Sequence, residues 1–311
     1  MDFLSAISQG NLTALRLTPK SDLHNHCLLG GKRAYIEHYY GKKLAPFYAT
    51  AVGIHDMNRW IRDVYKPFLS LPGAFERAVE AAFIQAKQDG ITVLEMSIDV
   101  MFGKMFNVSD ERVVKTLDRC HKTLAPELDF RPEMGFPRTV SPEILRSRFE
   151  TLMDFHYFRS VDLYDDEFAQ PIHCFKEIYQ VARKMGIKCK AHVGEFGDAD
   201  SVKEAVEVLQ LDAVQHGIGV ADSHAVMKWM ADLKIPLNIC PTSNIRLKRI
   251  RSLKTHPIRI LFDQGVIVTV NTDDALIFNT SVSGEFKKLF KAGLFNAAEL
   301  DQIRVYGLDA I

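Results

Sequence analysis

Short apolar runs alternate with longer amphipathic segments along most of this chain. Strand candidates are centred near residues 22, 93, 130, 161, 190, 214, 238 and 268, which gives eight. Several are continuous apolar runs, as expected for parallel strands covered on both faces. Helix-period segments separate them, at 74–88, 110–124, 142–154, 172–185, 201–209, 223–233 and 255–262. Eight strands alternating with helices favour an α/β fold of the (β/α)8 TIM-barrel type. A doubly wound sheet is the alternative, but no Gly-x-Gly-x-x-Gly follows an early strand.

Residues 32–88 interrupt this alternation with mainly helical patterns. They predict a helical insertion after the first strand, within a single domain spanning residues 1–311. The insertion contains several large aromatic residues, which we expect to be buried in its core. The alternative is an apolar lid over a site, because excluding water strengthens electrostatic interactions inside it. The aromatic residues are Phe47, Trp60, Tyr65 and Phe68.

Composition excludes several classes of protein. The 39 basic and 39 acidic residues balance, so no electrostatic signature of nucleic-acid or membrane-surface binding is present. No apolar run is long enough to span a bilayer, and the N-terminus lacks the pattern of a secretory signal. Five scattered cysteines without a Cys-x-x-Cys indicate reduced thiols, so we expect a cytoplasmic protein. The sequence leaves the oligomeric state open.

Candidate chemistry collects where the predicted strands end. His24 and His26 are two residues apart, and residues i and i+2 of a strand point to the same face. Imidazole is the commonest metal ligand, and zinc binds it readily. Because barrel active sites lie at the C-terminal ends of the strands, the other strand ends bear on the same site. Those ends are at Asp99, Asp162, His192, His216, Asn238 and the Asp273–Asp274 pair.

Each of these runs has an ordinary structural interpretation. A histidine at a strand end can be bonded to the backbone, and aspartates there can cap the following helix. Glu195 follows His192 across a glycine, and Gly217 follows His216, so the backbone can turn at both places. Their shared place at one barrel face favours a functional site over coincidence.

Taken together, these runs resemble the ordered motifs of the adenosine deaminase family, a group of metal-dependent amidohydrolase barrels. The resemblance extends from about residue 17 to the end of the chain. The motifs are Asp22-Leu-His24-x-His26 with Gly30-Gly31, His192-Val-Gly-Glu195, His216-Gly217, Cys240-Pro-Thr-Ser-Asn244 and Thr272-Asp273-Asp274.

The resemblance implies zinc-dependent hydrolytic deamination of an adenine nucleoside or related 6-aminopurine, releasing ammonia. It implies one Zn²⁺ per chain, with a small-molecule purine nucleoside or nucleotide as the partner. Glu195 would protonate ring nitrogen N1, His216 would help deprotonate or orient the attacking water, and Asp274 would hydrogen-bond the base. The implied metal ligands are His24, His26, His192 and Asp273.

Departures from the family pattern concern the substrate. The family commonly has an acidic residue soon after His-x-His, near the sugar's 5′ end, where this chain has the apolar Leu28 and Leu29 before Gly30. Asp165 replaces a glycine whose N–H faces the purine in the family, so Asp165, Leu28 and Gly30 are expected substrate-binding residues beside Asp274. We hypothesise a 5′ group other than a plain hydroxyl.

Two kinds of 5′ group fit this hypothesis. An apolar group, as in a methylthio-nucleoside, suits the leucines, whereas AMP or dAMP would need cations such as Lys32 and Arg33. Two further alternatives are another mononuclear-zinc amidohydrolase and a non-catalytic barrel. A cytidine-deaminase site is disfavoured, because the chain lacks Pro-Cys-x-x-Cys.

Overall fold

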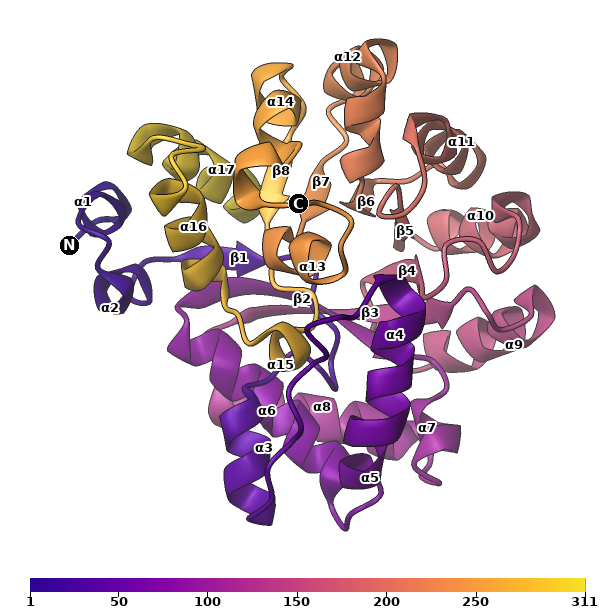
Figure 1. Cartoon of the computed structure of the whole chain (residues 1–311). Coiled ribbons are helices and arrows are strands. Elements are labelled where there is room, and N and C mark those ends of the chain that lie inside the picture. Colours follow the sequence, from indigo (N-terminus) through magenta and orange to yellow (C-terminus); the bar gives the residue numbers. More distant parts are fainter. Residues whose placement is uncertain (311) are drawn as a thin grey trace.

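Eight parallel strands form one sheet in which each strand pairs with the next along the chain. The computed structural model describes residues 1–310. Just beyond β1 and β8, a bridge between Asn25 and Asp273 links the two ends of the sheet. The result is the predicted (β/α)8 barrel (Figure 1), and the strand order excludes a doubly wound sheet. The strands are β1 (Lys20–Asp22), β2 (Ile91–Asp99), β3 (Asp129–Pro137), β4 (Ser160–Tyr164), β5 (Lys188–Val193), β6 (Ala213–His216), β7 (Leu237–Ile239) and β8 (Val268–Val270).

Helices surround the strands, as the amphipathic segments predict (Figure 1). Ser141 caps one of them through its side chain, as its position before Pro142 indicates. Other boundaries differ from expectation: Asp198 caps α11, which starts before residue 201, and α14 starts only after Pro257. The outer helices are α6 (Ala74–Gln88), α8 (Asp110–Leu124), α9 (Pro142–Met153), α10 (Lys176–Lys184), α11 (Ala199–Leu209), α12 (His224–Leu233), α14 (Ile258–Asp263), α16 (Val282–Lys291) and α17 (Ala297–Leu308).

Several shorter helices connect the main elements. Within residues 1–310, no helix is long and apolar enough to cross a membrane. The short α-helices are α1 (Phe3–Ser8), α2 (Leu12–Leu15), α7 (Phe102–Met105), α13 (Pro241–Arg246) and α15 (Ala275–Phe278). Three 3₁₀ helices span η2 (Ile172–Phe175), η3 (Ile218–Asp222) and η4 (Leu253–Thr255).

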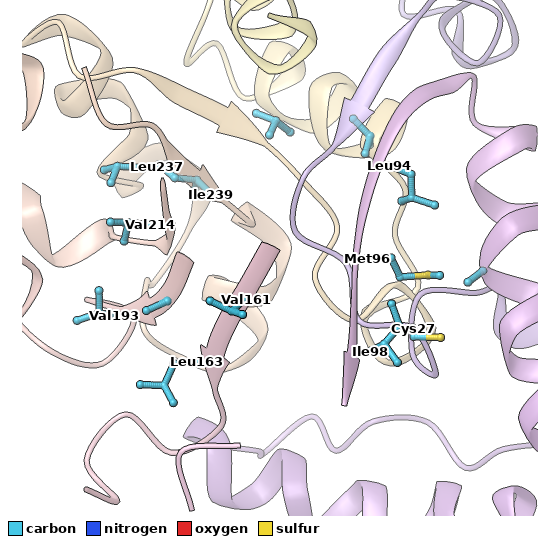
Figure 2. Close-up of a cluster of buried hydrophobic side chains, with 14 of the residues drawn as sticks. Cys27, Leu94, Met96, Ile98, Val161, Leu163, Val193, Val214, Leu237 and Ile239 are labelled. Atoms are coloured by element: carbon cyan, nitrogen blue, oxygen red, sulfur yellow. The ribbon is translucent and has the colours of Figure 1, made fainter. Parts of the chain in front are cut away.

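The strands are less uniformly apolar than expected, because their two faces differ. Along most of the strands beyond β1, apolar side chains alternate with polar ones and are buried in a continuous hydrophobic cluster, part of which Figure 2 shows. Its labelled members include Leu94, Met96, Ile98, Val161, Leu163, Leu237 and Ile239. Many intervening positions hold polar or charged residues that are buried as well, among them Ser97, Glu133, Asp162, Lys190 and Asn238.

Charged groups occupy the barrel interior. The ammonium group of Lys190 on β5 lies 2.6 Å from a carboxylate oxygen of Glu95 on β2 and also contacts Glu133 on β3. A buried charge is tolerated only when it is paired, and here one cation meets two carboxylates. The expectation of continuous apolar strands was therefore wrong for the inward face.

The predicted helical insertion follows β1 and contains α3 (Arg33–Tyr40), α4 (Gly53–Trp60), the π-helix η1 (Ile61–Tyr65) and α5 (Lys66–Leu69). Trp60 and Tyr65 are fully buried, as expected for core aromatics. The Tyr65 hydroxyl donates a 2.7 Å hydrogen bond to the carbonyl of Leu28. This bond ties the insertion to the segment that follows His26.

Candidate active site

Four side chains at the C-terminal ends of the strands converge on one point. One ligand atom from each of His24, His26, His192 and Asp273 lies within 4.8 Å of the others. The two Nε2 atoms of His24 and His192 are 3.0 Å apart, and Asp273 Oδ1 is 3.2 Å from His26 Nε2. Three imidazole nitrogens and one carboxylate oxygen form a donor set that suits zinc and related divalent metals. The residues present therefore fit a metal site.

Local backbone structure explains the convergence. His24 and His26 lie just beyond β1 rather than within it. The chain bends at His24, and the next two residues, Asn25 and His26, bridge to Asp273 and Ser97. Both rings can therefore reach one point, as their spacing predicts. Asp273 has a left-handed backbone, with φ 60°, and its N–H donates to the carbonyl of His24 at 2.9 Å.

In His24 and His192, Nδ1 also has a hydrogen-bond partner in the protein. His24 Nδ1 lies 3.1 Å from the carbonyl of Asn238, and His192 Nδ1 lies 3.1 Å from the carboxylate of Asp162. Such contacts place the proton on Nδ1 and leave Nε2 as a ligand. Sequence reasoning placed Asn238 and Asp162 at strand ends without a role, and the structure gives each one a contact.

Two carboxyl groups beside the ligand set have oxygens without protein partners. Oε1 of Glu195 and Oδ1 of Asp274 are buried and make no hydrogen bond within residues 1–310. Burial, reinforced by repulsion from Asp273, raises the pKa of Glu195 well above its ordinary value. Burial and the same neighbour raise the pKa of Asp274 to about 8. These two groups can therefore keep a proton near neutral pH.

His216 ends β6 beside these groups. Its Nε2 lies 3.5 Å from Oε2 of Glu195 and 4.0 Å from Oδ2 of Asp273. Its backbone is left-handed, with φ 63°, and Gly217 continues that turn with φ 66°. A non-glycine residue in this conformation is strained, and such strain is common at functional sites.

Sequence reasoning missed Glu167, which organises the loop carrying Glu195. Its buried carboxylate accepts hydrogen bonds from the backbone N–H groups of Gly194 at 2.5 Å, Phe196 at 2.9 Å and Gly197 at 3.2 Å. Arg249 supports the same loop by donating to the carbonyl of Glu195. The available signal was the acidic run at residues 165–167, whose last member cannot be distinguished from a solvated carboxylate by sequence alone.

A cavity of about 450 Å³ opens in front of the ligand set. Three of the expected substrate-binding residues, Leu28, Asp165 and Asp274, are among the residues that line it. Gly30 is not among its lining residues: a Cβ there would lie 2.1 Å from Asn25 Oδ1, so this glycine makes room for Asn25.

Two proposed phosphate contacts also lie outside the cavity lining. Lys32 donates a 2.8 Å hydrogen bond to Gln88, and Arg33 donates a 2.6 Å bond to the carbonyl of Ala45. Neither side chain is directed at a ligand in the cavity.

Asp165 joins two sides of the cavity. Its backbone has φ 80°, a conformation that favours glycine, which agrees with the glycine of the family pattern. Oδ1 accepts a 3.0 Å hydrogen bond from Asn58 of the insertion, and Oδ2 accepts a 2.8 Å bond from Thr139 after β3. The replacement therefore links α4 to the barrel.

The chain matches known proteins over most of its length. The family model described as adenosine deaminase matches residues 39–310. A protein of Treponema pallidum named putative adenosine/adenine deaminase is 31% identical over 91% of this chain and 95% of its own length. An adenine deaminase of Zymomonas mobilis is 31% identical over 72% of this chain and 67% of its own length.

Solved structures share the fold. An adenine deaminase from Arthrobacter aurescens superposes with a TM-score of 0.84 at 23% identity, covering 94% of this chain and 93% of that one. An amidohydrolase from Burkholderia ambifaria, with bound Zn, gives 0.82 at 20% identity, covering 97% of this chain and 88% of that one. This chain belongs to the adenosine deaminase family and is a hydrolase that acts on the C–N bonds of adenine compounds.

Proposed function

We propose that this protein uses a single bound zinc ion to hydrolyse the bond between C6 and the amino nitrogen of an adenine nucleoside. The products are ammonia and the 6-oxo purine nucleoside. One observation carries the proposal: the four-residue ligand set adjoins Glu195 and Asp274, two buried carboxyl groups with oxygens free to meet a ligand. The ligands come from both ends of the chain, which supports its acting as one barrel domain.

His24, His26, His192 and Asp273 would hold the zinc ion. Zinc supplies activation of the nucleophile, because it lowers the pKa of water from 15.7 to about 7. The donor set supports zinc, since imidazole nitrogens and carboxylate oxygens are both ordinary zinc ligands.

The remaining steps belong to the protein's own groups. Water attacks C6, a C–O bond forms, and the ring loses aromaticity, so a proton must reach N1 as charge develops. Glu195 would deliver that proton, which its raised pKa keeps available. Asp274 would hydrogen-bond the base through Oδ1, and His216 would position the attacking water. Glu195 then regains a proton from the attacking water, and the proton left on the C6 oxygen passes to the amino nitrogen as its C–N bond breaks. Ammonia leaves and the 6-oxo purine remains.

The cavity supports a substrate larger than free adenine. Cavities of about 300–1,000 Å³ are typical of drug-sized ligands, and this one has about 450 Å³. Beyond the ligand set, apolar side chains line most of it, and we call this part the outer chamber. Its members are Met57, Ile61, Leu69, Phe102, Met105 and Phe106.

Charge along the cavity lining disfavours a phosphate. Asp99 and Asp165 line the cavity, and their carboxylates would repel an anion. Within residues 1–310, Arg62 and Lys66 are its lining cations, and both side chains are exposed at the rim. Arg62 is also paired with Asp63 at 2.8 Å.

The orientation of the purine follows from the reaction. With C6 at the ligand set and N1 at Glu195, the opposite edge bearing N9 points toward the outer chamber. We therefore propose an adenine nucleoside with an apolar 5′ group, of which 5′-methylthioadenosine is the test compound. AMP and dAMP are the competing candidates.

Glu195→Gln tests the reaction. The variant keeps the ligand set but cannot supply the proton, so it should retain bound zinc and lose at least about 100-fold in kcat, since general acid catalysis contributes about 10²–10⁴-fold. Near-normal deamination by Glu195→Gln would refute this mechanism. Hydrolysis of a ring amide or ester, with no adenine compound deaminated, would identify another amidohydrolase activity.

A substrate panel tests the outer chamber. We expect kcat/KM for 5′-methylthioadenosine to exceed the values for adenosine, adenine and AMP by about tenfold or more. A small apolar group that fits a hydrophobic pocket changes kcat/KM by about 10–200-fold. Ile61→Lys places a cation in the outer chamber. It should lower the preference for 5′-methylthioadenosine and raise kcat/KM for AMP. Val64→Lys on the same π-helix, outside the cavity lining, is the matched control. Preference for adenosine, adenine or AMP in the unmodified enzyme would refute the apolar 5′ group.

A further inference from the structure

His256 is a buried histidine outside the cavity lining. Its ring lies between a backbone amide and a side-chain amide. Nδ1 is 3.2 Å from the backbone nitrogen of Ile258, and Nε2 is 3.3 Å from Oδ1 of Asn244. Asn244 belongs to the Cys240-Pro-Thr-Ser-Asn244 motif and is itself fully buried.

The other end of the Asn244 amide meets His216. Nδ2 of Asn244 lies 3.2 Å from Nδ1 of His216, whose Nε2 faces the ligand set. A chain of three hydrogen bonds therefore runs from the backbone of α14 through His256 and Asn244 to His216. Both ends of this chain are rigid, because Ile258 begins a helix and His216 ends a strand.

The direction of these hydrogen bonds is fixed at the Ile258 end. Histidine tautomers and asparagine amides can each be placed in two ways, but a backbone N–H can only donate. Nδ1 of His256 must therefore accept, and its Nε2 carries the proton. That proton is donated to Oδ1 of Asn244, so the amide nitrogen points at His216 and donates to Nδ1. The opposite arrangement would set the Ile258 N–H against a protonated Nδ1.

Burial supports this assignment. It lowers the pKa of His256 to about 3, so the ring stays neutral and keeps one accepting nitrogen at neutral pH. No charged side chain contacts the ring in residues 1–310, which leaves the two amides as its polar partners.

We propose that His256 and Asn244 are positioning residues that hold His216 in the tautomer protonated at Nε2. The assignment of His216 to the reaction rests on the proposed function. In this tautomer His216 presents an N–H to the site, 3.5 Å from Oε2 of Glu195. It therefore orients the attacking water by donating to its oxygen, and the neutral ring offers no lone pair there to act as a base.

Long-range ¹H–¹⁵N NMR of the imidazole rings tests the tautomer directly. We expect the His216 signal, assigned by its loss in His216→Gln, to show a protonated Nε2 and an unprotonated Nδ1. Asn244→Asp replaces the donor with an acceptor and should move a proton to Nδ1. Ser243→Ala, one residue away on α13, should leave the signal unchanged. A wild-type His216 protonated at Nδ1 would overturn the proposal.

Kinetics supply a second readout. Asn244→Asp should lower kcat by about 100-fold or more and change KM little. In the Ser-His-Asp triad, holding the catalytic histidine in the wrong tautomer lowers kcat by about 10⁴-fold. His256→Leu should also lower kcat, and His256→Gln, which keeps an N–H donor, should restore most of it. Equal kcat for the leucine and glutamine variants, at equal thermal stability, would contradict the proposal. If the wild type deaminates no adenine compound, the proposed function fails, and NMR still decides the tautomer.

Discussion

The carboxylate of Asp162 lies 3.1 Å from Nδ1 of His192, and the aspartate is completely buried in the middle of β4. A carboxylate at this place fixes which ring nitrogen carries the proton and turns Nε2 toward the other ligands. The contact joins two neighbouring strands, β4 and β5, so the barrel itself sets the orientation of one proposed metal ligand.

Asp162→Asn should therefore weaken metal binding by about 10–100-fold, as expected when a partner of a ligating histidine is altered. The amide keeps the shape of the carboxylate but loses its charge. Competition with a chelator of known affinity measures the change. Asp129→Asn is the control, because Asp129 is exposed and pairs with Arg131 at 2.7 Å. Equal metal affinities for the two variants would show that Asp162 does not orient His192.

Glu167 should control activity through the loop that carries Glu195. Glu167→Gln loses the charge and one of the accepting oxygens that hold the N–H groups of Gly194, Phe196 and Gly197. Hydrogen bonds to a charged group contribute about 1.5–3 kcal/mol, so we expect kcat to fall about tenfold or more. Metal content should not change. Asp166→Asn, whose carboxylate accepts from Phe168 in the same turn, is the control and should keep near-normal kcat.

At position 165, replacing aspartate by glycine should destabilise the protein less than replacing it by alanine. Both Asp165→Gly and Asp165→Ala lose the hydrogen bonds from Asn58 and Thr139, but only alanine is strained at φ 80°. We expect the glycine variant to have the higher free energy of unfolding, by about 1 kcal/mol, in urea denaturation. At Asp166, which has no positive φ, the same pair of substitutions should not favour glycine. The same order at both positions would argue against strain at Asp165.

His256 should make stability depend on pH. Burial lowers its pKa from 6.5 to about 3 in the folded state, so only the unfolded chain binds a proton between these values. Stability therefore falls as pH decreases from about 6.5 toward 3, by up to about 1.4 kcal/mol per pH unit. Denaturant unfolding of the wild type and His256→Gln across this range measures the difference in slope. Parallel pH dependence for the two proteins would contradict a neutral buried ring.

The sequence specified the barrel because its signals are local and periodic. Eight runs of strand-forming residues alternate with amphipathic helices, and each pattern reflects which faces are buried. Boundaries were less certain: α14 begins at Ile258 rather than near residue 255, since the preceding turn is a separate 3₁₀ helix. The barrel interior was also misjudged, because a lysine that pairs with glutamates on other strands cannot be distinguished from a surface lysine by sequence.

For the site, the sequence by itself determined which residue types stand at the strand ends, and parallel strands must bring those ends to one face. The resemblance of these strand-end motifs to the adenosine deaminase family then singled out His24, His26, His192 and Asp273 as the expected metal ligands. Only the tertiary structure decided what their neighbours do, because Glu167, Asp162 and His256 act through contacts between segments distant in sequence. Distances, burial and hydrogen-bond direction arise only when those segments pack, and they turned a set of ligands into a site with oriented groups.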